Sequence, residues 1–176
     1  MTYGEKMEES IEEKWSGDYT VNGHDVEVVT SVVVLNDGNK HDTTKSQKAS
    51  TINFNNEAGV SHVDPHGKIL FWEDGSWTKS NPGTITMYAG YDDSGNHPEN
   101  RYNSNDFDIV IAHEFGHVLG IKDGYKDPET KDIDSIMCDE FGDRNAIKRE
   151  DRKATDLDIE KALNAYKKDK WQYWAK

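Results

Sequence analysis

The order of hydrophobic patterns along the chain predicts an α+β domain. A helical pattern comes first, short apolar runs rich in β-branched and aromatic residues follow, and two further helical patterns complete the chain. The chain has 176 residues, which is the usual size of one domain and is enough to bury a core that holds a site rigidly. We therefore expect one domain over residues 1–176.

The first helix is expected within EKMEESIEEKWSG, residues 5–17. Met7, Ile11 and Trp15 recur every four residues with acidic residues between them, so a single apolar stripe faces a core. Gly17 is expected to end this helix.

Strands are expected between this helix and the next helical pattern. DVEVVTSVVVL, residues 25–35, is rich in β-branched residues and has no helix breaker, which predicts a buried strand. Polar loops are expected at residues 36–50 and 91–105. Shorter strand candidates between these loops are STINFN (50–55), KILFWE (68–73) and TITMYAG (84–90).

A second helix is predicted in DFDIVIAHEFGHVLGIKDGY, residues 106–125, with Ser104 or Asn105 as its cap. Its core-facing stripe has a spacing of four residues and comprises Phe107, Ile111, Phe115 and Leu119.

The chain is expected to be irregular over residues 126–145 and to form a last helix within residues 154–171. Thr155 is the expected N-cap of that helix, and Asp158 lies in its first turn.

Composition excludes several kinds of partner and site. A net charge of -13 repels phosphates, so nucleic acid is not an expected partner. Cys138 is the only cysteine, which rules out an internal disulfide and a cysteine-based zinc site. No run reaches the roughly 18 apolar residues of a membrane span, and the amino terminus lacks a signal pattern.

The HEFGH motif places metal-binding chemistry on one face of the second helix. His113 and His117 lie one turn apart and can converge on an ion, while Glu114 is rotated by about 100° and suits a general base. Gly120 can adopt the left-handed C′ conformation, which turns the chain back and brings Asp123 towards the ion. The pattern predicts one catalytic Zn²⁺ with three protein ligands and an open fourth position.

HEFGHVLGIKD resembles the extended zinc motif of the metzincin metallopeptidases, HExxHxxGxx followed by His or Asp, and HEFGHVLG is similar to its matrixin form. DIDSIM resembles the Met-turn of that family, which assigns this role to Met137, and ATDLDIEKALNAY is similar to the matrixin closing helix. The resemblance implies a twisted, mostly parallel sheet with an antiparallel edge strand. It also implies a subdomain over residues 1–120 that contains the active-site helix, and a second over residues 121–176 with the Met-turn and final helix.

Asp123 departs from the histidine of most metzincins and resembles snapalysin-like enzymes and metallopeptidase domains of bacterial polymorphic toxins. A carboxylate offsets part of the charge of the ion, so the bound water should be less acidic than in a three-histidine site. The resemblance implies a metalloendopeptidase in which zinc polarises the water and the carbonyl and Glu114 transfers the proton.

Other residues have weaker functional interpretations. Tyr125 can hydrogen-bond the tetrahedral intermediate or Asp123, although a packing role fits equally well. The resemblance also implies a substrate-binding edge strand, for which the candidates are Thr84, Ile85, Thr86, Met87, Tyr88 and Ala89, with an interior strand as the alternative.

Two loops have weak metal-binding patterns. The spacing of His62, Asp64 and His66 permits a second metal, but a solvated loop is preferred. DDSGN, residues 92–96, lacks the full pattern of a calcium loop and is interpreted as a turn. Cys138 is expected to be a small buried residue.

Two rival functions remain. Glu140 with Asp143 gives the downstream ExxD of thermolysin-like peptidases, and a catalytically silent, zinc-stabilised binding module would need no base at Glu114. The expected partners are a protein or peptide substrate and, for a toxin domain, a cognate inhibitor or immunity protein. We expect a monomer that is secreted or delivered to a target cell as an effector, with a digestive protease as the alternative role.

Overall fold

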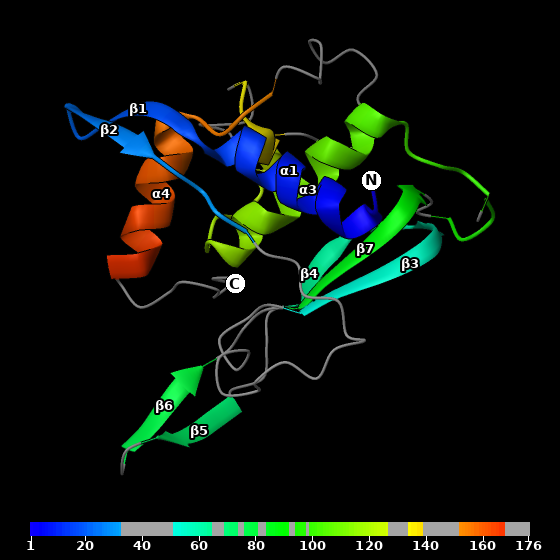
Figure 1. The fold of residues 1–176 in the computed structure, drawn as a ribbon, viewed down its shortest axis with the longest axis horizontal. Coiled ribbons are helices and arrows are strands. Elements are labelled where there is room, and N and C mark those ends of the chain that lie inside the picture. Colours follow the sequence, from blue (N-terminus) through cyan, green and yellow to red (C-terminus); the bar gives the residue numbers. More distant parts are fainter. Residues whose placement is uncertain are drawn as a thin grey trace.

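The computed structural model has an α+β fold, which confirms the predicted fold class (Figure 1). It describes residues 1–32, 51–64, 69–73, 76–80, 84–91, 94–97, 99–126, 134–138 and 152–167. The helices within these ranges are α1 (Tyr3–Trp15), α3 (Ser104–Val118) and α4 (Asp156–Lys167), with short 3-10 turns η1 (Gly124–Lys126) and η2 (Ile136–Cys138). The strands are β1 (Gly17–Val21), β2 (His24–Val28), β3 (Thr51–Gly59), β4 (His62–Asp64), β5 (Ile69–Glu73), β6 (Ser76–Ser80) and β7 (Thr84–Tyr91).

Helix α1 confirms the predicted amphipathic segment. Thr2 and Glu5 form a capping box, which satisfies free N–H groups and starts the helix at Tyr3. The predicted stripe of Met7, Ile11 and Trp15 is at most 2% exposed. This face packs along α3 (Figure 1).

The strand predicted at residues 25–35 is confirmed over residues 25–28, but the prediction that it is buried and continues through residue 32 is wrong. β2 ends at Val28, its side chains are exposed or half-buried, and residues 29–32 belong to no strand. An Asn22–Gly23 turn, with φ of 51° and 77°, folds β2 back onto β1 as an antiparallel hairpin. Residues 33–35 lie outside the described ranges.

The central sheet has the strand order β3-β7-β4. β3 runs parallel to β7 and β4 runs antiparallel to it, so the sheet is mixed, whereas a mostly parallel sheet was expected. β7 is therefore an interior strand, and the prediction that Thr84, Ile85, Thr86, Met87, Tyr88 and Ala89 form a substrate-binding edge is wrong. β3 pairs along one side of β7 and β4 pairs with Thr84, Ile85 and Thr86 on the other side, so the antiparallel edge strand is β4. β5 and β6 form a separate antiparallel hairpin.

Helix α3 begins at Ser104, one residue earlier than a Ser104 cap would give and two residues earlier than an Asn105 cap would give. Asn103 is the N-cap, because its Oδ1 accepts the Asp106 N–H at 2.9 Å. Ser104 and Asn105 therefore lie in the first turn, and the Ser104 hydroxyl accepts from Lys6 instead. Phe107 and Ile111 are buried as predicted, whereas Phe115 and Leu119 are only partly buried.

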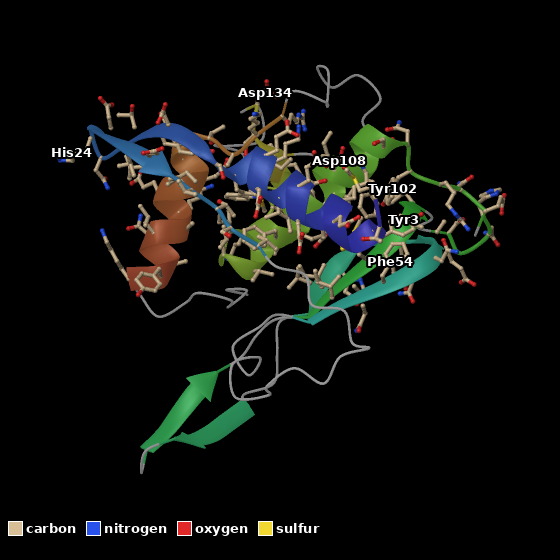
Figure 2. The ribbon with its side chains drawn as sticks, viewed as in Figure 1. Tyr3, His24, Phe54, Tyr102, Asp108 and Asp134 are labelled. Carbon is tan, nitrogen blue, oxygen red and sulfur yellow. The ribbon has the colours of Figure 1, made fainter. Side chains whose placement is uncertain are left out.

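Polar contacts fix α1 against α3. The Asp108 carboxylate, labelled in Figure 2, accepts from Lys6 Nζ at 2.7 Å and from Ser10 Oγ at 2.8 Å. The Trp15 indole N–H donates to the Ala112 carbonyl at 2.8 Å, one residue before His113. The amino-terminal helix thus supports the helix that carries HEFGH.

Gly116→Ala is expected to destabilise the fold by about 1–3 kcal/mol. A Cβ at Gly116 would meet the Met137 sulfur and would lie 2.8 Å from Trp15 Cζ2, and both side chains are 1% exposed. Urea unfolding measures the change, with exposed Asn164→Ala on α4 as a control expected to stay within about 0.5 kcal/mol. Unchanged or raised stability for Gly116→Ala would show that this contact can relax.

Candidate metal centre

Three buried side chains meet at the carboxyl end of α3. One metal-binding atom from each of His113, His117 and Asp123 lies within 4.8 Å of the others, and this is the only such group among the described residues. Each histidine Nε2 lies 3.2 Å from Asp123 Oδ1. All three residues are at most 9% exposed, so the site is built into the core.

The helix and the turn after it produce this geometry locally. His113 and His117 are four residues apart, which places their rings on one face with centroids 4.7 Å apart. Gly120 has a φ of 87°, its N–H donates to the His117 carbonyl, and the Ile121 N–H donates to the Gly116 carbonyl. These bonds form a Schellman motif, which confirms the predicted C′ glycine and reverses the chain before Asp123.

Backbone carbonyls orient both imidazoles. His113 Nδ1 lies 2.9 Å from the Ile136 carbonyl oxygen, and His117 Nδ1 lies 2.8 Å from that of Ile121. A carbonyl oxygen only accepts, so each Nδ1 must carry the proton and each Nε2 faces Asp123. This is the tautomer in which a neutral histidine offers Nε2 to a metal, so the donor set fits a zinc ion.

Glu114 lies beside the three ligands and is 6% exposed. Its Oε2 is buried and has no hydrogen-bond partner among the residues that the structure describes. Burial raises the pKa of this carboxyl, and the positive charges of His113 and His117 partly oppose the shift. An unpaired buried carboxylate oxygen is costly, so this oxygen is available to a water or a ligand at the site.

The protonation of His113 is coupled to the same carboxylates. Burial by itself would lower the pKa of His113, but the hydrogen bond to Asp123, the charge of Glu114 and the Ile136 carbonyl together outweigh it and raise that pKa. A metal ion and a proton therefore compete for Nε2 of His113.

Two further predicted residues lie next to the ligands. The Tyr125 ring is half-buried and stacks on His113, with centroids 6.4 Å apart and an interplanar angle of 22°. Met137 is buried in η2 and contacts α3 at Gly116, so the expected turn lies directly against the helix that carries the histidines. Cys138 is buried, as expected, and packs against Gly124.

The other candidates are not assembled into a site by the described residues. His62 is exposed on β4, and its Nδ1 lies 2.8 Å from the Val60 carbonyl. His66 lies outside the described residues, as do Glu140 and Asp143 of the thermolysin-like alternative. Residues 94–96 of the DDSGN segment form a bend, which agrees with the predicted turn.

Strand β4 lies close to Glu114, a neighbour that sequence reasoning did not identify. Ser61, directly before β4, accepts the Tyr88 N–H and hydrogen-bonds the Tyr102 phenol. Burial and, more weakly, the charge of Glu114 raise the pKa of Tyr102, so the phenol is near the carboxyl. In the sequence, only the neighbouring strands β3 and β7 had a recognisable β-branched and aromatic composition.

Comparisons with protein families, with curated proteins and with solved structures find no match to this chain. Among the described residues, no helix combines the length and the apolar composition that crossing a membrane requires.

Proposed function

We propose that this chain is a zinc-dependent metalloendopeptidase of the metzincin type. The observation that carries the proposal is Glu114, a buried acid with an unpaired oxygen beside the ligand group His113, His117 and Asp123. A structural zinc site closes its coordination with four protein ligands and needs no base, whereas a hydrolytic site needs three ligands and a base. The Gly120 turn and the contact of Met137 with α3 also agree with the metzincin pattern.

His113, His117 and Asp123 would hold the ion, which when bound supplies Lewis acidity for a scissile carbonyl and for water. Glu114 accepts the proton of the attacking water and returns it to the departing amine. Tyr125, stacked beside His113, would donate its hydroxyl proton to the developing oxyanion.

We place the substrate along β4 in place of β7. Among the described strands β4 pairs only with β7, so its outer edge offers N–H and C=O groups to an extended peptide. Val63 faces the core at 7% exposure, and His62 lies near enough to Glu114 that its positive charge would lower the pKa of that carboxyl. A peptide that pairs with this edge of β4 would therefore lie close to the Glu114 carboxyl.

The biological role that we favour is a secreted or delivered effector whose partners are a protein substrate and a cognate inhibitor or immunity protein. The resemblance of the Asp123-type motif to toxin metallopeptidase domains supports this role. The net charge of -13 favours basic stretches of a substrate over acidic ones, because the field of the protein attracts them.

Incubating the zinc-loaded protein with an unfolded protein mixture and with a cell lysate tests the proposal. New peptide termini should appear, should vanish with a chelator, and should return when zinc is restored. Metal-loaded protein that produces no new termini in either mixture would instead support the binding-module alternative.

A further inference from the structure

A buried carboxylate on α4 reaches the metal centre through a chain of hydrogen bonds. Asp158 is 3% exposed, and its Oδ2 accepts from Ser135 Oγ at 2.6 Å. The same oxygen accepts from the N–H and from the hydroxyl of Thr155, each at 2.8 Å. These two donors hold Asp158 in one position, so its bond to Ser135 is directed.

Ser135 transmits this contact to η2. Its hydroxyl donates to Asp158 and accepts the Met137 N–H at 2.9 Å, and the residue is 1% exposed. The Ile136 carbonyl, which lies 2.9 Å from His113 Nδ1, shares a planar peptide group with the Met137 N–H, so the bond from that N–H to Ser135 also orients the carbonyl. On the other side, the Ile136 N–H donates to the Lys153 carbonyl at 3.0 Å. The orientation of the Ile136 carbonyl thus depends on the bonds on both sides of it.

We propose that Asp158 is a positioning residue for the metal ligand His113, acting through Ser135 and the Ile136 carbonyl. The inference rests on the proposed metal centre but does not require peptide hydrolysis. Without Asp158 the Ser135 hydroxyl loses its acceptor and can rotate away from the Met137 N–H. The Ile136 carbonyl then no longer fixes the His113 ring, and loss of such an outer partner typically costs 10- to 100-fold in metal affinity.

Asp156 provides a matched control in the same helical turn. Its Oδ1 accepts the Thr20 N–H of β1 at 2.9 Å, and the side chain is exposed. Asp156→Ala removes an equal charge from the start of α4, together with one hydrogen bond, but does not touch η2. A loss of metal affinity caused by the helix dipole would therefore appear in both variants, and one caused by hairpin docking would appear in Asp156→Ala. A loss caused by misplacing His113 would appear only in Asp158→Ala.

Cobalt titration of the apoprotein, followed by visible absorption and by competition with a chelator, tests the proposal. Ser135→Ala and Asp158→Ala should each weaken Co²⁺ binding by about 10- to 100-fold and alter the absorption bands. The double variant should be no weaker than either single variant, because both break one chain of contacts. Asp158→Asn, whose carbonyl oxygen can replace Oδ2, should recover most of the affinity, and Asp156→Ala should bind like wild type.

Single variants that bind Co²⁺ within about twofold of wild type, or effects that add in the double variant, would overturn the proposal. If Asp158→Ala does not fold, Ser135→Ala decides, because Asp158 then keeps both bonds to Thr155. Normal cobalt binding without any cleavage would count against the peptidase alone, so the two failures can be distinguished.

Discussion

Glu114→Gln is expected to keep the metal and to reduce peptide hydrolysis by about 10²- to 10⁴-fold. Glu114 is not one of the three converging ligands, and glutamine has nearly the same shape. Its amide cannot accept the proton of the attacking water. Zinc content and melting temperature should stay close to those of wild type, because the substitution also removes a carboxyl that is buried with an unpaired oxygen.

The measurement compares cleavage rates at equal zinc occupancy. Glu27→Gln, an exposed substitution on β2, controls for the loss of one negative charge and should cut at the wild-type rate. Equal cleavage by Glu114→Gln and wild type would show that the mechanism proposed here is wrong.

The helices could be predicted from the sequence because their signals are local. In α1 the stripe of Met7, Ile11 and Trp15 requires only a periodicity of four, and the structure buries all three. In α4 the predicted Thr155 directly precedes the helix, but its hydroxyl donates to Asp158, whose carboxylate satisfies the Thr155 N–H. The predicted cap position and the place of Asp158 in the first turn are confirmed.

The strands were predicted less well because pairing is not local. The strands β1, β4 and β6 were missed, and β4 has three residues, too few for a recognisable alternation. β7 alternates buried Ile85, Met87 and Ala89 with half-buried residues, and an edge strand covered on one face has the same pattern. Only its ladders with β3 and β4 reveal that it is central.

In the candidate site, the ligands could be predicted from local spacing, whereas the contacts that position them could not. His113, His117 and Asp123 fall within eleven residues on one helix and its turn, so spacing was enough to predict that they converge. Ser135 and Asp158 are 23 residues apart in sequence, and no periodic signal links them. Contacts that position the ligands thus required the folded chain.

Asp123→Ala is expected to weaken zinc binding more than the roughly 10- to 100-fold cost of losing an outer partner, because one of three protein ligands is removed. Its Oδ1 is the atom that lies 3.2 Å from Nε2 of both His113 and His117. Removing the carboxylate also removes the negative charge between the two adjacent imidazoles. The ion would then be held by two neutral nitrogen ligands, without the attraction of a charged oxygen. Competition with a chromophoric chelator measures the change, together with the metal content after dialysis.

Glu140→Ala separates this ligand set from the thermolysin-like alternative, in which Glu140 would be the third ligand. If Asp123 binds the ion, Glu140→Ala should leave zinc affinity within about threefold of wild type, as expected for an acid outside the coordination shell. Asp123→His adds a second comparison, because histidine is the commoner residue at this place in the family that the motif resembles, and it should restore zinc binding relative to Asp123→Ala. Zinc affinity that survives Asp123→Ala but is lost in Glu140→Ala would assign the chain to the thermolysin-like class, since the ion would then be held by a carboxylate from the segment after η2.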